Sequence, residues 1–317
     1  MKIIYIGDFI KNNGPSTVDI LLKKHFERNQ VQDLSFIFLQ AGKKIEVVNI
    51  WQIISSNVVH VSGVSNFGLV ALFLGWLFRK KCTMTMHGSL FQESRFRPVP
   101  KYRLIMETLQ KFFATKLFPV SKLLAINIKA RKAVVIPNGV ERHAVNQSNK
   151  SDYEIVLVGG GRPEKRHLEV CKAIESVKAE TGWNILVHLF GEKGKDSDAI
   201  ESFPFIHYHG FCNKDELKRY LETAKLFIQY SKFESFSLAV SEALYCGCHI
   251  ITSPYVGINE FIEKSHSYHV VDSRLDLENS IRKILSTNEK PAINERLLTW
   301  SAVSDLYLEQ WVELYNE

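Results

Sequence analysis

The stretch that decides the fold is Ile-Val-Leu-Val-Gly-Gly-Gly-Arg-Pro-Glu-Lys-Arg, at residues 155–166. Four consecutive apolar residues predict a buried strand over 155–158, and the three glycines predict a tight turn after it. A helical pattern over 168–180 follows this turn. A strand, a glycine turn and a helix form the first half of a βαβ unit, so the sequence predicts a parallel sheet.

The same alternation continues along the chain in both directions. Before the glycine turn, strands are predicted over 3–6, 34–39, 58–61, 82–86 and 117–120, with helices over 17–29, 68–78 and 102–113. After it, strands are predicted over 185–190, 226–229 and 249–252, with helices over 215–224, 238–246 and 300–315. This rhythm predicts an α/β protein whose sheets are covered by helices on both faces.

A turn signal divides the chain near its middle. Pro137-Asn138-Gly139 precedes a polar stretch over 141–152, where we expect the linker between two domains. A chain of 317 residues is long enough for two domains. We therefore predict two doubly wound domains, over 1–148 and 149–299, with ligands bound in a cleft at the carboxyl ends of both sheets.

Composition excludes several classes of protein. With 45% hydrophobic and 23% charged residues, the chain is neither disordered nor fibrous. The longest apolar run, 67–78, is shorter than the ~20 residues that span a bilayer, so we expect neither a spanning helix nor a signal peptide. Five scattered cysteines without a Cys-x-x-Cys pair predict a reducing cytoplasm, no disulfide framework and no zinc site.

The charge is unevenly distributed. Residues 1–150 hold 22 Lys and Arg against 8 Asp and Glu, whereas the remainder holds 18 against 26. Most of the excess lies in 79–132, where 13 basic residues and several aromatic residues accompany only two glutamates. Such a stretch suits an anionic membrane, an anionic substrate or nucleic acid, and it is also typical of a solvated helix face over aromatic core residues. Because no nucleic-acid-binding motif accompanies it, we expect no nucleic-acid partner.

Two cations follow the glycine turn. Arg162 and Lys165 lie where a parallel strand ends, and the pattern is neither a Walker loop nor a G-x-G-x-x-G fingerprint. Glycines that admit close backbone approach, together with two cations, suit a diphosphate. The structural alternative is an ordinary basic turn between a strand and a helix.

Two glutamates eight residues apart form a second motif. If a helix begins near Ser237, Glu234 lies in the preceding loop and Glu242 lies on the second turn. The amides over 236–239 are then free to bind an anion. A carboxylate accepts hydrogen bonds from a vicinal diol, so Glu242 suits a ribose and Glu234 a hexose. Taken alone, the pair could also be two solvated glutamates at a helix start.

These motifs carry a family resemblance when they are combined with three short turns. The turns are Thr85-Met86-His87-Gly88, Ile136-Pro137-Asn138-Gly139-Val140 and Gly257-Ile258-Asn259-Glu260. In order and spacing the whole set resembles the retaining glycosyltransferases of family four, which have the GT-B fold. The resemblance implies two Rossmann-like doubly wound domains facing across a cleft, with the C-terminal helix, 300–317, crossing back to the first domain.

The resemblance also implies a reaction and a set of roles. A sugar would pass from a nucleotide-diphosphate donor, with a UDP-sugar favoured, to a hydroxyl with retained configuration, without a metal or cofactor. Arg162 and Lys165 would hold and neutralise the diphosphate, Glu242 would bind the ribose, and Glu234 would position the transferred sugar. His87, which could equally be a plain strand-end histidine, would contact the donor hexose. Catalysis would thus rest on Glu234, His87, Arg162 and Lys165, and further donor contacts would come from Gly14, Gly161, Phe236, Ser237 and Leu238.

The basic first domain gains a specific interpretation from the resemblance. In this family that domain takes the acceptor, so Arg95, Arg97, Lys101 and Arg103 would face a lipid-linked glycan at an anionic membrane surface. We hypothesise a bacterial enzyme of surface polysaccharide synthesis, such as capsule or O-antigen, peripheral on the inner face of the cytoplasmic membrane.

The sequence departs from the family pattern at three places. Ser237 and Val256 stand where the family usually has glycine, and Asn13-Gly14 replaces a glycine pair. Each added side chain is expected to narrow the space near the phosphate or sugar. A catalytically silent GT-B nucleotide-binding subunit is therefore an alternative. A non-hydrolysing nucleotide-sugar epimerase, which shares the GT-B architecture, is another.

Overall fold

The computed structural model describes residues 1–10, 14–28, 34–130, 133–141, 150–292 and 296–317. The chain divides into two compact units, one of residues 1–139 with 298–317 and the other of residues 140–297. The predicted boundary at 148/149 and most of the predicted linker lie outside the described residues. Within the described part, no helix is long and apolar enough to cross a membrane.

The first unit is built on a parallel sheet in the order β2-β1-β3-β4-β5. Its strands are β1 (Lys2–Gly7), β2 (Ser35–Gln40), β3 (Val58–Ser62), β4 (Lys81–Met86) and β5 (Lys116–Pro119). Every residue of Ile3–Ile6 in β1 is buried, which is typical of a strand covered by helices on both faces. The strand order reverses between β1 and β3, which places a topological switch point there.

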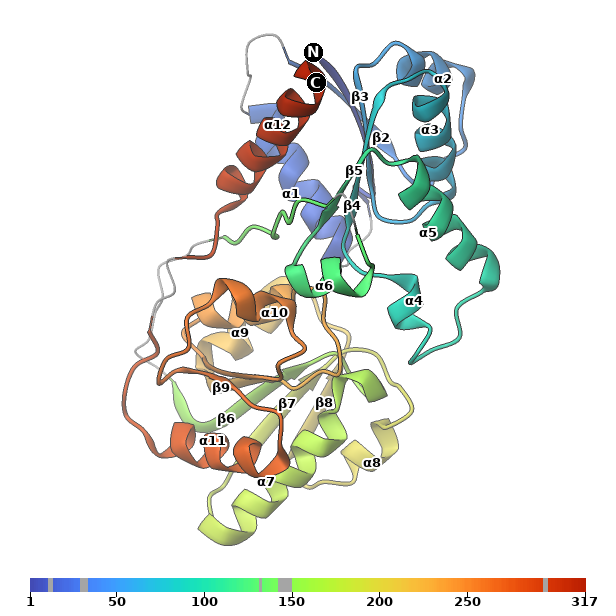
Figure 1. The fold of residues 1–317 in the computed structure, drawn as a ribbon. Helices are drawn as coiled ribbons and strands as arrows, with labels where there is room; N and C mark the ends of the chain where they lie inside the picture. The colour runs from blue at the N-terminus through green and yellow to red at the C-terminus, as the bar shows by residue number, and fades with distance from the viewer. Residues whose placement is uncertain (11–13, 29–33, 131–132, 142–149, 293–295) are drawn as a thin grey trace. The chain divides into compact units, whose positions relative to one another are not determined.

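Helices cover both faces of this sheet (Figure 1). On one face lie α1 and α12, and on the other lie α2, α3 and α5, as α1 (Gly14–Arg28), α12 (Trp300–Asn316), α2 (Val47–Ile54), α3 (Asn66–Leu77) and α5 (Lys101–Phe113). Two short helices complete the unit, α4 (Leu90–Glu93) and α6 (Lys122–Asn127). The C-terminal α12 is tied to β4, since the Tyr307 hydroxyl lies 2.8 Å from Thr85 Oγ1 and the Trp311 indole donates to Thr83 Oγ1.

The second unit repeats this plan with a sheet in the order β11-β10-β9-β6-β7-β8. Its strands are β6 (Ser151–Val158), β7 (Leu186–Phe190), β8 (Ile206–Gly210), β9 (Ala224–Gln229), β10 (His249–Thr252) and β11 (Tyr268–Val270). Its helices are α7 (His167–Thr181), α8 (Ser197–Glu201), α9 (Lys214–Thr223), α10 (Leu238–Tyr245) and α11 (Arg274–Ser286), with short 3-10 turns η1 (Pro163–Lys165) and η2 (Gly257–Phe261). Pairing is parallel throughout, so the predicted α/β class with two doubly wound units is confirmed.

The switch point of the second sheet lies between β6 and β9. These strands pair directly, for example Ile155 with Leu226, although two other strands, β7 and β8, lie between them in the chain. Strands on the two sides of this pair continue in opposite directions across the sheet, so the loops that follow β6 and β9 diverge at the carboxyl edge. The Arg162–Lys165 turn and the Glu234 loop are these two loops.

Candidate functional site

The glycine turn after β6 is fixed by the neighbouring strand β7. The amides of Gly159 and Gly160 both donate to the Phe190 carbonyl, at 2.7 and 2.8 Å, and Gly161 donates to the Glu192 carbonyl at 3.2 Å. Gly160 has φ +64°, and a Cβ there would lie 1.9 Å from the Glu192 carbonyl oxygen. The absence of side chains at these glycines therefore allows the segment after β7 to pack closely against the turn.

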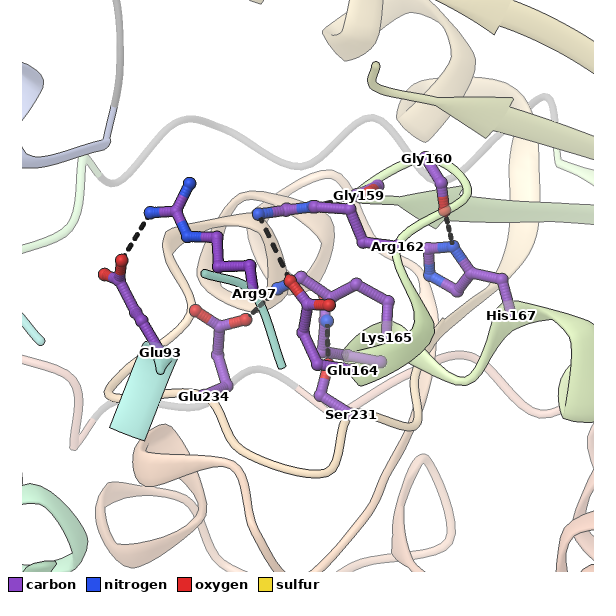
Figure 2. Close-up of polar contacts among 11 residues, drawn as sticks. Glu93, Arg97, Gly159, Gly160, Arg162, Glu164, Lys165, His167, Ser231 and Glu234 are labelled. Carbon is purple, nitrogen blue, oxygen red and sulfur yellow. Dashed lines mark hydrogen bonds and ion pairs between the residues drawn. The ribbon is translucent and has the colours of Figure 1, made fainter. Parts of the chain in front are cut away.

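Lys165 crosses this turn and meets Glu234. A Cβ on Gly159 would lie 2.9 Å from Lys165 Cγ, so the missing side chain makes room for the lysine stem. The Lys165 ammonium group forms an ion pair with the Glu234 carboxylate, which comes from the loop after β9 (Figure 2). The Lys165 side chain is 10% exposed, whereas the Glu234 side chain is 25% exposed. Two residues predicted to hold different parts of one donor are thus in contact.

Arg162 is anchored through its Nε, and the end of its guanidinium remains accessible to solvent. Its Nε donates to the Gly159 carbonyl at 2.9 Å, and one terminal nitrogen lies 3.8 Å from the Glu164 carboxylate. The side chain is half exposed, and Figure 2 shows the guanidinium beside the Lys165 turn. A guanidinium anchored through Nε keeps terminal N–H groups for a bidentate contact with a phosphate.

Arg166 is a residue that the sequence analysis did not select. It has φ +55°, a left-handed conformation that is uncommon outside glycine. Its Nε donates to the Tyr230 carbonyl at 2.7 Å, and its guanidinium lies 3.7 Å from the Tyr230 ring centre. These contacts clamp the Lys165 turn to the end of β9. Nothing in the sequence distinguishes this structural arginine from its two basic neighbours.

The Glu234 loop rests on the turn after β10. The Glu234 amide donates to the Tyr255 carbonyl at 2.9 Å, and its carbonyl accepts from the Gly257 amide at 2.8 Å. The Phe236 carbonyl accepts from the Ile258 amide at 2.9 Å. The turn at 257–260, one of the motifs that carried the resemblance, therefore supports the backbone of the candidate site.

Ser237 has the backbone conformation of a glycine. Its φ is +91°, and its hydroxyl accepts from the Val240 amide at 3.4 Å as the N-cap of α10. A left-handed non-glycine residue costs of order 1–3 kcal/mol. Val256, the other departure from the family pattern, has an ordinary φ of −110° and a side chain only 1% exposed. The departure at 237 is thus accommodated by backbone strain.

Glu242 lies on the second turn of α10, which begins at Leu238. Its Oε1 is 3.5 Å from the ammonium nitrogen of Lys214, the first residue of α9. Burial raises the pKa of the Glu242 carboxyl, and the Lys214 ammonium group opposes that rise. Among the described residues the carboxylate thus pairs with Lys214, and its side chain remains 35% exposed.

The structure thus gathers most predicted donor residues at one edge of the second sheet. Arg162, Lys165 and Glu234 form a connected cluster, and Phe236, Ser237 and Leu238 lead from it into α10, which carries Glu242. Gly161 belongs to the turn that holds this cluster. The arrangement presents two cations, a helix N-terminus and two carboxylates, which can bind an anionic diphosphate and hydroxyl groups.

A separate cavity occupies the switch point of the first unit. It has a volume of about 370 Å³, and its lining includes Asp8, Gln40, Ser62 and His87, which follow or end four neighbouring strands. Such a volume lies within the usual range for small-ligand pockets. Among the predicted residues, His87 and Arg103 both line this cavity.

A buried polar chain orients His87 in this cavity. His87 Nε2 lies 2.8 Å from the Ser62 hydroxyl, which is also hydrogen-bonded to Asp19. Asp19 further accepts from the Tyr5 hydroxyl and the Asp8 amide, both at 2.8 Å. Burial raises the pKa of Asp19 to about 7 and lowers that of His87 to about 4, so the imidazole is neutral. Within the described residues the buried Nδ1 of His87 has no hydrogen-bond partner.

The remaining predicted residues of the first unit are dispersed. Gly14 begins α1, and a Cβ there would meet nothing within 4 Å; Asn13 lies outside the described residues. Arg95 and Lys101 are exposed, and Arg97 forms an ion pair with Glu93 (Figure 2). Within the described ranges no cluster of three or more His, Cys, Asp or Glu side chains is placed to hold a metal ion.

A family match decides what the second unit is. Residues 140–296 match the family described as "Glycosyl transferases group 1". The chain carries a group 1 glycosyltransferase domain. This domain coincides with the second unit and contains Arg162, Lys165, Glu234 and Glu242. No curated protein matches the sequence significantly.

Solved structures extend the likeness in fold to the whole chain. Sucrose-phosphate synthase from Thermosynechococcus elongatus has a TM-score of 0.70 at 16% identity, over 99% of each chain. The lipopolysaccharide outer core galactosyltransferase WaaB, in its apo form, has a TM-score of 0.70 at 15% identity, over 99% of this chain and 100% of that one. Anabaena HepE in complex with UDP and glucose has a TM-score of 0.67 at 14% identity, over 100% and 97%. At these identities the likeness establishes the fold, which is the GT-B glycosyltransferase fold.

Proposed function

We propose that the chain is a retaining glycosyltransferase that moves a sugar from a UDP-sugar to a hydroxyl of a lipid-linked glycan, without a metal ion. The observation that carries the proposal is the contact between Lys165 and Glu234 at the switch point of the second sheet, beside the open guanidinium of Arg162. One side of this cluster suits a diphosphate and the other suits sugar hydroxyls. That HepE is solved with UDP and glucose supports the choice of donor.

The chemistry follows from these charges. The bond between the anomeric carbon and the diphosphate oxygen breaks, and its electron pair stays on the diphosphate. Arg162, Lys165 and the N-terminal amides of α10 neutralise the charge that develops there. The acceptor oxygen bonds to the same face of the anomeric carbon, and its proton passes to the leaving phosphate. Glu234 positions the sugar and forms no covalent intermediate in this proposal.

In this proposal the cavity of the first unit binds the acceptor substrate. When Asp19 is ionised it only accepts hydrogen bonds, so the Ser62 hydroxyl donates to it and accepts from His87 Nε2. The Nδ1 of His87, which has no hydrogen-bond partner among the described residues, is then an acceptor for a substrate hydroxyl. We further propose that the lipid-linked glycan belongs to bacterial surface polysaccharide synthesis, at the inner face of the cytoplasmic membrane. The basic excess of residues 79–132 supports an anionic surface as partner.

A second candidate is a nucleotide-binding subunit without turnover. The strained backbone of Ser237 favours it, because a displaced loop between Glu234 and α10 would bind a nucleotide while misplacing the sugar. A non-hydrolysing epimerase has no such observation in its favour.

The test of the proposed function is donor turnover with excess EDTA. Purified protein is incubated with a panel of UDP-sugars and a membrane lipid extract, and UDP release and the anomeric configuration of the product are measured. The proposal expects UDP release and a retained configuration, both lost in Glu234→Gln. Nucleotide binding without release would establish the silent subunit, and conversion of free UDP-sugar into its epimer would establish the epimerase.

A further inference from the structure

The helix α3 carries apolar side chains on all its sides, although only one of these sides packs on the sheet. Its twelve residues, Asn66–Leu77, contain no charged side chain. Its inner side, which includes Phe67, Ala71 and Leu72, is buried. Its outer side carries Val70, Phe73 and Trp76, which are exposed, Trp76 by 50%. A helix that is apolar all round is normally buried all round, so the outer side of α3 lacks the covering that its composition predicts.

The neighbouring helix α5 is polar on the inside. Glu107 and Gln110 are both 0% exposed. The Glu107 carboxylate accepts from the Ser89 hydroxyl and the Leu90 amide, and Gln110 donates to the Ser65 carbonyl. These bonds satisfy the Glu107 carboxylate and the Gln110 amide nitrogen, whereas the Gln110 Oε1 has no partner among the described residues. The inward side of α5 is therefore held largely by polar contacts.

The outer side of α5 is correspondingly apolar. Ile105, Leu109 and Phe112 follow one another at spacings of four and three residues and are all exposed, Phe112 by 70%. Residues at these spacings share one face of a helix. A water-facing helix shows the opposite pattern, with its polar side outward.

The two outer sides form one surface, because α3 and α5 lie side by side (Figure 1). The ring of Phe113 lies 5.4 Å from Phe73 and 5.4 Å from Trp76, which joins the two helices. We call the surface made by Val70, Phe73, Trp76, Ile105, Leu109 and Phe112 the α3–α5 face. A contiguous exposed apolar surface of this kind marks an interaction site.

Cations flank the α3–α5 face in the part of the chain that the structure describes, and none of the six side chains of the face is charged. Arg79 follows α3 and is exposed, and Lys101 begins α5 and is exposed. The two glutamates of the 79–132 stretch are both engaged, since Glu107 is buried and Glu93 pairs with Arg97. The surface therefore combines aromatic and aliphatic side chains with an unopposed positive rim.

We propose that the α3–α5 face docks on an anionic lipid bilayer. The apolar side chains enter the boundary between headgroups and acyl chains, and the flanking cations contact lipid phosphates. A second copy of the chain fits less well, because a two-fold contact through this face would place its cationic rim against itself. The inference rests on the lipid-linked acceptor of the proposed function and identifies the surface that meets the lipid.

The test compares binding to vesicles of phosphatidylcholine with 30% phosphatidylglycerol against pure phosphatidylcholine, by flotation at low salt. Wild type should bind the anionic vesicles and bind pure phosphatidylcholine at least tenfold more weakly. Trp76→Glu/Phe112→Glu should weaken binding on the order of 100-fold, because two inserted aromatic side chains become carboxylates. The matched control, Ile126→Glu/Leu275→Glu, makes the same charge change at exposed apolar residues away from this face and should keep wild-type binding.

Two readouts separate this inference from the proposed function. Both double variants should keep the wild-type UDP-induced shift in melting temperature, which shows that they fold and bind donor. Equal vesicle binding by the two double variants would overturn the inference while leaving the donor site intact. A wild-type dimer in solution that Trp76→Glu/Phe112→Glu converts to a monomer would overturn it in favour of a second copy.

Discussion

The ammonium group of Lys165 is paired with the carboxylate of Glu234, a residue 69 positions further along the chain. The pair joins the loops after β6 and β9 at the switch point of the second sheet. Each side chain has a different predicted partner on the donor, the diphosphate for Lys165 and the sugar for Glu234. Substitutions of the two residues should therefore affect different steps, donor binding for Lys165 and turnover for Glu234.

Lys165→Met should weaken UDP binding by tenfold or more, because a charge-assisted contact to the diphosphate is lost. Glu234→Gln should keep UDP binding within a few-fold and lower the turnover number by roughly 100-fold, since it removes a group that acts on the sugar. Isothermal titration with UDP and steady-state kinetics measure the two effects. Equal loss of UDP binding in both variants would contradict the assignment of separate roles.

Ser237→Gly should raise the free energy of unfolding by about 1 kcal/mol. The change relieves a left-handed non-glycine conformation and gives up only the few tenths of a kcal/mol that serine contributes as an N-cap. Ser241→Gly, inside α10, is the control and should destabilise by about 1 kcal/mol. Urea denaturation measures both, and a destabilised Ser237→Gly would show that the conformation is not strained.

Gly160→Ala should destabilise the protein by about 3 kcal/mol or more, because the new Cβ would meet the Glu192 carbonyl oxygen at 1.9 Å. Gly182→Ala is a matched control, since Gly182 has φ +71° against +64° but open space around a Cβ. Gly182→Ala should lower the free energy of unfolding by about 1 kcal/mol. Equal losses in thermal or urea denaturation would mean that the loop after β7 moves freely out of the way.

Asp19 should make stability fall as the pH rises. Burial raises the pKa of its carboxyl from 3.8 to about 7, so the folded protein binds a proton that the unfolded chain has released. The contribution is fully present below pH 4 and is lost as the pH rises through 7. Between pH 5 and 8 wild type should lose about 2–3 kcal/mol relative to Asp19→Asn, which has no proton to lose. Urea denaturation at the two pH values measures this difference, and parallel curves would refute it.

Strands whose residues are buried on both faces were predicted from the sequence. Strands that mix polar and apolar residues, such as β8, were missed. Unbroken apolar runs at 3–6, 155–158 and 226–228 lie within β1, β6 and β9. The strand β8, Ile206–Gly210, contains two histidines and a tyrosine, and its half-buried pattern resembles a loop. The three-residue β11 and the helices α2 and α11 were also missed, because short or strongly polar elements depend on tertiary packing.

For the site, residue types and spacing predicted which loops would matter, and long-range contacts supplied the rest. The Lys165–Glu234 pair, the clamp of Arg166 on Tyr230 and the left-handed Ser237 each depend on neighbours far away in the chain. The α3–α5 face is a similar case. The sequence showed its aromatic residues, but only the structure shows that Glu107 points inward and Phe112 outward.

The most direct test of the central claim is a thermal-shift titration with UDP, GDP, ADP and CMP in EDTA, for wild type, Glu242→Ala and Glu222→Ala. Glu222 lies on the exposed side of α9 and serves as the control. A nucleotide at a hundredfold excess over its dissociation constant adds ~2.7 kcal/mol, a shift of several degrees. The account predicts that UDP shifts wild type and Glu222→Ala but not Glu242→Ala. No shift in wild type with any of the four nucleotides would contradict a donor site at this edge of the sheet.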